Sequence, residues 1–145
     1  MQNDHEAVHT VTDYYDGPRR GIADFHGRPH VYQSLWDNSE DDWSDAFLLQ
    51  AIDDETFRLA MEDWDIWSRW ERAFHSGRGT IETHPALPAD RHRHDEIAAI
   101  VKPRLHLEPE RAIRVRGRFT VRTPPESGSG STGQWVVSWL THENE

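Results

Sequence analysis

The stretch DETFRLAMEDWDIWSRWERAFH, residues 54–75, decides the fold that the sequence predicts, because it holds three of the seven tryptophans in one long periodic segment. At 100° per residue its polar side chains form a narrow stripe, and apolar side chains cover most of the remaining arc of about 240°. An ordinary surface helix needs an apolar stripe of only about 100°. Asp53 suits the N-cap position, and Gly77 supplies a C-terminal stop. We therefore expect a helix covered on two sides, by a sheet and a second helix or by a partner chain.

Two carboxylates, Asp63 and Glu71, fall on the apolar arc of this predicted helix. Burying such a group without a partner costs on the order of 3–5 kcal/mol, so each must be paired, protonated or next to a cleft. One interpretation is a tuned acid in a functional site. The other, which we favour, is an ion pair with an arginine from elsewhere in the chain, or a position at the rim of the core.

Length and charge limit the classes of protein to which the chain can belong. A chain of 145 residues predicts one domain, here residues 11–145, after a disordered tail over residues 1–10. The formal charge of −10 makes nucleic acid an unlikely partner. No run approaches the ~18 apolar residues of a membrane span, and residues 1–10 do not resemble a signal peptide. The chain contains no cysteine, which excludes disulfides and thiolate ligands. We expect a cytoplasmic protein with no membrane partner.

The rest of the chain alternates between strand patterns and one further helix. Strand patterns cover residues 11–15, 21–25, 30–36, 46–52, 112–122 and 135–140. A second, shorter helix is expected to start near Pro88 and to end before Pro103. Residues 123–133 are rich in glycine and serine and predict a flexible loop. The predicted fold class is α+β, with an antiparallel sheet of about five strands packed against the Trp-rich helix and the shorter helix.

The strand over residues 112–122 carries the sharpest local signal for binding. Alternation places four arginines on one face of this strand, about 7 Å apart: Arg114, Arg116, Arg118 and Arg122. Such a row could hold an anion, a nucleic-acid backbone or an acidic partner. It could equally pair with the acids of this chain, which number 26, among them Asp63 and Glu71. The candidate binding residues are these four arginines and the two carboxylates.

Motifs for catalysis, metals and cofactors do not appear. The phosphate-binding glycine fingerprints, the HExxH zinc pattern and the GxSxG nucleophile motif are missing. The acidic loop over residues 37–42 lacks the ligand spacing of an EF-hand. In the segment RHRHDE, residues 91–96, the pairs Asp90–His94 and His92–Glu96 have i,i+4 spacing and predict a network on a helix surface. We therefore predict no catalytic residues, no metal and no cofactor.

Three functions are compatible with these patterns. The first is a non-enzymatic, acidic interaction module that forms a homodimer through Trp-rich surface or inhibits a basic protein partner. The second is a small enzyme for an anionic substrate, with Arg114, Arg116 and Arg118 around the anion and Asp63 or Glu71 as general acid or base. The third, least favoured, is nucleic-acid binding along the arginine strand with aromatic stacking. We favour the first and lean against an enzyme.

Overall fold

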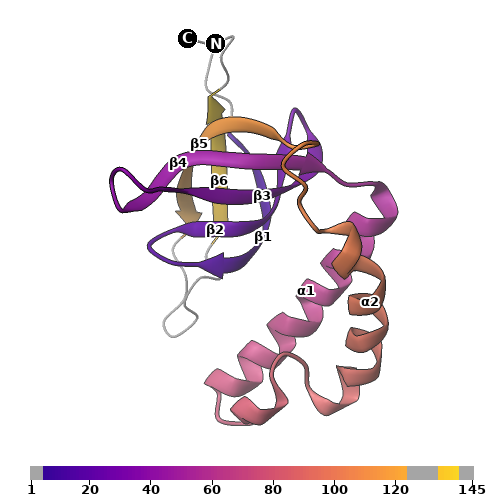
Figure 1. The fold of residues 1–145 in the computed structure, drawn as a ribbon. Coiled ribbons are helices and arrows are strands. Elements are labelled where there is room, and N and C mark those ends of the chain that lie inside the picture. The colour runs from indigo at the N-terminus through magenta and orange to yellow at the C-terminus, as the bar shows by residue number, and fades with distance from the viewer. Residues whose placement is uncertain (1–4, 124–133, 141–145) are drawn as a thin grey trace.

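The computed structural model describes residues 5–123 and 134–140. Six antiparallel strands form a closed barrel in chain order, and the first strand pairs back onto the last (Figure 1). The strands are β1 (Glu6–Tyr14), β2 (Pro18–Phe25), β3 (Arg28–Asp37), β4 (Asp42–Ala51), β5 (Ile113–Thr123) and β6 (Gln134–Leu140).

The closed barrel overturns the expected fold class, which was an open antiparallel sheet of about five strands packed against the long helix. The first part of β1 was missed, because the predicted strand pattern begins only at residue 11. Residues 6–10 belong to β1, so the predicted disordered tail was wrong there, whereas residues 1–4 lie outside the described part. The pairs Glu6↔Val137 and Ala7↔Val136 close the barrel. This pairing joins strands about 130 residues apart in the sequence. It could not be predicted from the alternation of apolar and polar residues in either strand, because that alternation is the same in an open sheet and in a barrel.

The barrel fills its own interior instead of burying one face under a helix. Inward-facing side chains of five strands form one cluster, which consists of Ala23, Tyr32, Phe47, Leu49, Val115, Val137 and Trp139. The predicted hairpin between the last two strand patterns is confirmed, with Phe119 opposite Val137. In β5 Val115, Phe119 and Val121 are at least partly buried and the arginines are exposed, as the alternation predicts, whereas Ile113 at the start of the strand is exposed. Thr123 belongs to β5, and the rest of the predicted flexible loop lies outside the described residues.

The helices form a hairpin inserted between β4 and β5 that projects from one side of the barrel (Figure 1). The hairpin consists of α1 (Asp54–His75), the 3₁₀ turns η1 (Ile81–Thr83) and η2 (Pro88–Asp90), and α2 (Arg91–Arg104). The Asp53 side chain accepts a hydrogen bond of 2.8 Å from the Thr56 amide, as expected of an N-cap. Gly77 ends the turn after α1 with φ +80°, a conformation that glycine adopts without strain.

The second helix runs through Pro103, contrary to the prediction that it ends before this proline. Proline removes one amide donor and crowds the carbonyl four residues earlier, so a helix commonly ends close to it, and α2 ends one residue later, at Arg104. The last turn is still closed, because the Leu105 amide donates to the Val101 carbonyl at 2.8 Å. Pro103 therefore does mark the end of α2, but the predicted end lies two residues too early.

The hairpin has a hydrophobic core of its own, separate from that of the barrel. Leu59 and Ile66 of α1 pack with Ala86, Ile97 and Val101 in this second cluster. The expectation of a helix covered on two sides is met on one side by α2, whereas the other side faces the barrel more loosely. There, the side chains of Trp64 and Trp67 are only partly buried. Two cores that do not merge leave room between them.

A few contacts at one end fix the hairpin to the barrel. The Arg20 guanidinium donates to the carbonyl of Leu105, the C-cap residue of α2, at 3.2 Å. Gln50 of β4 bonds to the backbone on both sides of Leu107, donating to the His106 carbonyl at 3.1 Å and accepting from the Glu108 amide at 2.9 Å. In the first turn of α1, the ring of Phe57 meets the ring of His9 edge-on at 4.8 Å. These contacts hold the base of the hairpin, so its far half can stand away from the barrel wall.

Candidate functional site

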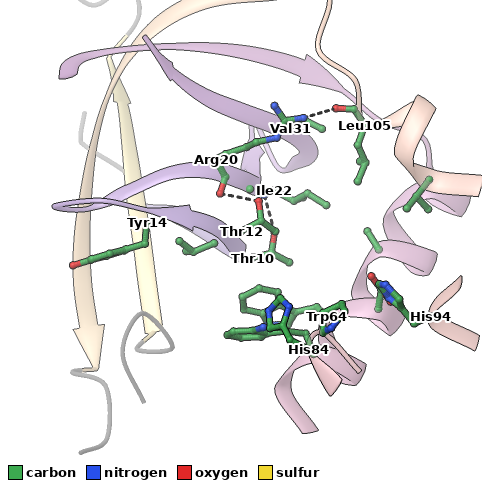
Figure 2. A pocket seen from close by; sticks show the side chains of 17 residues that line it. Thr10, Thr12, Tyr14, Arg20, Ile22, Val31, Trp64, His84, His94 and Leu105 are labelled. Carbon is green, nitrogen blue, oxygen red and sulfur yellow. Dashed lines mark hydrogen bonds and ion pairs between the residues drawn. The ribbon is translucent and has the colours of Figure 1, made fainter. Parts of the chain in front are cut away.

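The space between barrel and hairpin is a cleft of about 430 Å³ (Figure 2). Its barrel wall is the outer face of the first three strands and carries Val11, Ile22 and Val31. Its opposite wall comes from the helices and carries Ala60, Trp64, Trp67, Val101 and Leu105. In Figure 2, Thr10 and Ile22 lie on the barrel side, His94 on the helix side, and Trp64 with His84 at the lower end.

An irregular pairing of the first two strands stiffens the barrel wall. The register between β1 and β2 shifts around Thr10, whose hydroxyl accepts a hydrogen bond of 2.9 Å from the Ile22 amide. The Thr10 carbonyl accepts one of 3.0 Å from the hydroxyl of Tyr32, whose side chain is fully buried. Gly21 makes this approach possible, because a Cβ there would lie 2.1 Å from the Thr10 carbonyl oxygen. The wall is thus fixed by packing from inside the barrel.

Two tryptophans one helical turn apart form the aromatic part of the cleft. Trp64 and Trp67 stack with ring centroids 4.8 Å apart and an interplanar angle of 29°. The next tryptophan, Trp70, belongs to the hairpin core instead, and its indole N–H donates to the Thr83 hydroxyl at 2.9 Å. The His84 ring meets Trp70 edge-on and lines the end of the cleft. One helix therefore directs its tryptophans both to the core and to the cleft.

The polar centre of the cleft is a pair formed by Asp63 of α1 and His94 of α2. Asp63 Oδ1 lies 2.7 Å from His94 Nδ1, and the two side chains are only 26% and 18% exposed. A carboxylate can only accept here, so Nδ1 carries the proton. In the neutral ring Nε2 is then left as a hydrogen-bond acceptor. The pair thus presents an oriented imidazole to the cleft.

Arg20 adds a positive charge at the other end of the cleft. Its guanidinium donates to the Gln33 side-chain oxygen at 2.7 Å and to the Leu105 carbonyl, which are both uncharged acceptors. Within residues 5–123 and 134–140, no carboxylate lies within 4.0 Å of it. The cleft therefore contains an oriented histidine, an arginine without a counter-ion in this part of the chain, and otherwise mostly apolar walls.

The structure separates the site residues predicted from sequence. Asp63 lines the cleft, but its partner is a histidine and not an arginine. Glu71 lies outside the cleft lining, 3.9 Å from His75, and partial burial raises the pKa of its carboxyl. The two carboxylates remain predicted binding residues, now at different places.

The arginine row lies on the outer face of β5, away from the cleft. Arg116 pairs with Asp45 at 2.9 Å, in line with the interpretation that the row serves the chain's own acids. Arg114, Arg118 and Arg122 are exposed, and none of the four arginines lines the cleft. The arrangement in which these arginines and a tuned carboxylate share one pocket is therefore not present.

Sequence reasoning missed His94 and Arg20 as site residues. His94 was expected to pair with Asp90 on the helix surface, but Asp90 receives two hydrogen bonds, of 3.0 and 3.1 Å, from Arg69. The other expected pair, His92–Glu96, is present at 3.4 Å. A carboxylate on the apolar arc of α1 was the available signal. Its partner could not be identified without knowing which face of α2 packs against α1.

Comparisons with known proteins found no matching family model, no similar curated protein and no similar solved structure. No group of three or more histidine, aspartate or glutamate side chains in the described part of the chain is placed to hold a metal ion. Across the same residues, neither helix has both the length and the apolar character needed to cross a lipid bilayer.

Proposed function

We propose that the protein is a binding module that holds a small amphipathic molecule with a flat apolar part in the cleft between barrel and hairpin. The observation that carries this proposal is that an aromatic wall, formed by Trp64 and Trp67, faces a stiff apolar wall. The cleft between the two walls has a volume of about 430 Å³. Small-molecule sites typically enclose about 300–1,000 Å³ and combine apolar walls with a few convergent polar groups.

The geometry suggests how such a ligand would lie. Its flat part would rest on the indole of Trp64 or Trp67 and against Ile22 of the barrel wall, where aromatic contact adds about 0.5–1.5 kcal/mol to area burial. Its polar part would reach either His94, which offers an acceptor at Nε2, or the guanidinium of Arg20. A ligand with a donor at one end and an acidic group at the other would use both.

This proposal retains the binding function expected from the sequence and changes the ligand from a protein to a small molecule. The cleft is concave and mostly apolar, whereas the arginine row is exposed and partly engaged by the acids of the chain. We also propose a cytoplasmic location, because a chain without cysteine needs no oxidising compartment.

A second candidate function rests on the Asp63–His94 pair. A carboxylate that orients an imidazole is a common arrangement for a general base, so the cleft could deprotonate its ligand. The two candidates differ in their response to His94→Gln. Binding without catalysis predicts weaker binding and no change in the ligand, whereas catalysis predicts a product that disappears with the substitution.

The binding proposal can be tested with the amphipathic dye 1-anilinonaphthalene-8-sulfonate. We expect saturable binding to one site, with energy transfer from tryptophan to the dye. Replacing Trp67 by leucine should weaken this binding about threefold to tenfold, because the aromatic contact between the indole of Trp67 and the ring of the dye is lost.

The matched control is Trp36→Leu, since the Trp36 side chain is 46% exposed and lies outside the cleft. Affinity for the dye should stay unchanged in this variant. Equal affinities in the wild type and Trp67→Leu, or dye binding that does not saturate, would remove the support for a cleft ligand. Circular dichroism should first show that both variants are folded.

A further inference from the structure

A second hollow, of about 420 Å³, is lined by residues at and next to the β1–β2 and β3–β4 turns. Both turns lie on the left in Figure 1. Its lining shares only Tyr14 with that of the cleft and includes no residue of the helix hairpin. Inward-facing side chains of the strands line it, among them Arg19, Phe47, Phe119 and Trp135. Ligand binding at this hollow is independent of the function proposed for the cleft.

Arg19 is an unusual residue to point into the end of a barrel. Its Nε donates to the Tyr15 carbonyl at 2.7 Å, its Nη2 to the Asp16 carbonyl at 3.1 Å and its Nη1 to the Ser34 hydroxyl at 3.4 Å. The guanidinium also lies 5.2 Å over the ring of Trp43. All these partners are uncharged, and among the described residues no carboxylate is within 4.0 Å.

The two acids that line the hollow, Asp16 and Asp45, do not neutralise the guanidinium. Asp45 is engaged by Arg116, which donates to its Oδ2 at 3.1 and 2.9 Å. Asp16 is exposed and contributes only its backbone carbonyl to Arg19. A guanidinium has five N–H donors, so two of those on Arg19 remain for a ligand. The hollow thus has a positive group held in place by three neutral acceptors and one ring.

The rest of the hollow suits an aromatic ring. Phe47 and Phe119 line it with their ring centroids 5.2 Å apart, and Trp139, which belongs to the barrel core and not to the lining, meets each of them nearly edge-on at 5.7 Å. Gly117 makes room for this arrangement, because a Cβ there would lie 2.4 Å from the Trp139 ring. The indole Nε1 of Trp135 is buried and finds no acceptor among the described residues, which leaves a further donor at this end.

We propose that this barrel end is a binding site for a small aromatic carboxylate. Arg19 would take the carboxylate through its remaining donors, since a guanidinium matches the two oxygens of a carboxylate. The ring of the ligand would pack against the phenylalanines, with Trp43 behind the guanidinium. An uncharged analogue with the same ring would lose the interaction that fixes its orientation.

Benzoate and benzamide at constant ionic strength test this proposal, with binding followed through the indole N–H signals in ¹H–¹⁵N NMR spectra. Benzoate should shift the signals of Trp43 and Trp135 saturably and leave those of Trp64 and Trp67 in place. Benzamide should bind at least about tenfold more weakly, as expected when a charge-assisted hydrogen-bonding group is lost. The Arg19→Gln variant should lose benzoate binding by a similar factor.

The matched control is Arg28→Gln, which removes the same charge from the β2–β3 turn at the opposite end of the barrel. Benzoate affinity should stay within about twofold in this variant, since exposed charges at that distance are screened. Arg19→Lys, which keeps the charge without the planar fork, should fall between wild type and Arg19→Gln. It also provides a readout if the glutamine variant does not fold.

Three results would overturn the assignment. One is equal binding of benzoate and benzamide, and another is an Arg28→Gln variant that loses as much affinity as Arg19→Gln. The third is an absence of saturable shifts at Trp43 and Trp135. Shifts confined to Trp64 and Trp67 would belong to the cleft and would count against a site at the barrel end.

Discussion

Replacing Gly21 by alanine tests the packing that fixes the barrel wall of the cleft. The added Cβ would lie 2.1 Å from the Thr10 carbonyl oxygen and 2.7 Å from the Tyr32 hydroxyl. The first of these atoms is backbone, so rotating a side chain cannot relieve the contact. To reach even 3.0 Å, the two strands must separate by about 0.9 Å at a point where both are buried.

The expected loss in free energy of unfolding is about 1–5 kcal/mol. Overpacking a filled core costs about 1–3 kcal/mol. Separation of the strands would also break the 3.0 Å hydrogen bond from Tyr32 to Thr10, and an unsatisfied buried hydroxyl costs about 1–3 kcal/mol. Alanine recovers about 0.5–1 kcal/mol, because it loses less backbone freedom on folding than glycine does. Urea unfolding followed by circular dichroism and tryptophan fluorescence measures the difference.

Two further variants separate this explanation from a general effect of alanine. Gly79→Ala places its Cβ at an ordinary 3.5 Å from its neighbours and should change the free energy of unfolding by less than about 1 kcal/mol. In a Tyr32→Phe background the hydroxyl contact is absent but the backbone contact remains, so Gly21→Ala should keep its overpacking cost of about 1–3 kcal/mol and lose the cost of the broken hydrogen bond. A Gly21→Ala protein within about 0.5 kcal/mol of wild type would refute the reasoning.

Two carboxylates should give pH effects of opposite sign. Burial raises the pKa of Glu71, so the folded state holds its proton more tightly than the unfolded state does, and stability falls as this group ionises. Glu71→Gln should therefore raise the melting temperature at pH 7, and this gain should shrink as the pH falls towards about 4. Hydrogen bonds from Thr56 lower the pKa of Asp53, whose contribution is present at neutral pH and is lost as the pH falls through its folded pKa. Asp53→Asn, which keeps the cap, should have the melting temperature of the wild type near pH 7 and a higher one below about pH 4. A difference in melting temperature between variant and wild type that stays constant with pH would contradict both expectations.

The elements that could be predicted from sequence are those whose signals are local. The helix over residues 54–75 has a capping signal at each end and a helical pattern of apolar residues that continues over 22 residues, and its bounds are as expected. The strands around Gly117 and Val137 follow from alternation within a short segment. Closure of the barrel could not be predicted in this way, because it depends on pairing between Glu6 and Val137, at opposite ends of the chain. The cleft depends on a similar relation, since Asp63 becomes a site residue only when α2 brings a histidine to it.

The position of the cleft between two separate cores has a thermodynamic consequence. The hairpin is fixed to the barrel at its base, where Arg20 holds the C-cap carbonyl of α2 at 3.2 Å, and little else joins the two cores across the cleft. A ligand that touches Trp67 on one side and Ile22 on the other would add contacts between the cores that the free protein lacks. Binding only to the docked arrangement stabilises that arrangement by mass action. Affinity for the ligand and order of the hairpin are therefore linked, and a substitution of Gln50, which bonds the base of the hairpin from outside the cleft lining, should weaken binding without touching the ligand itself.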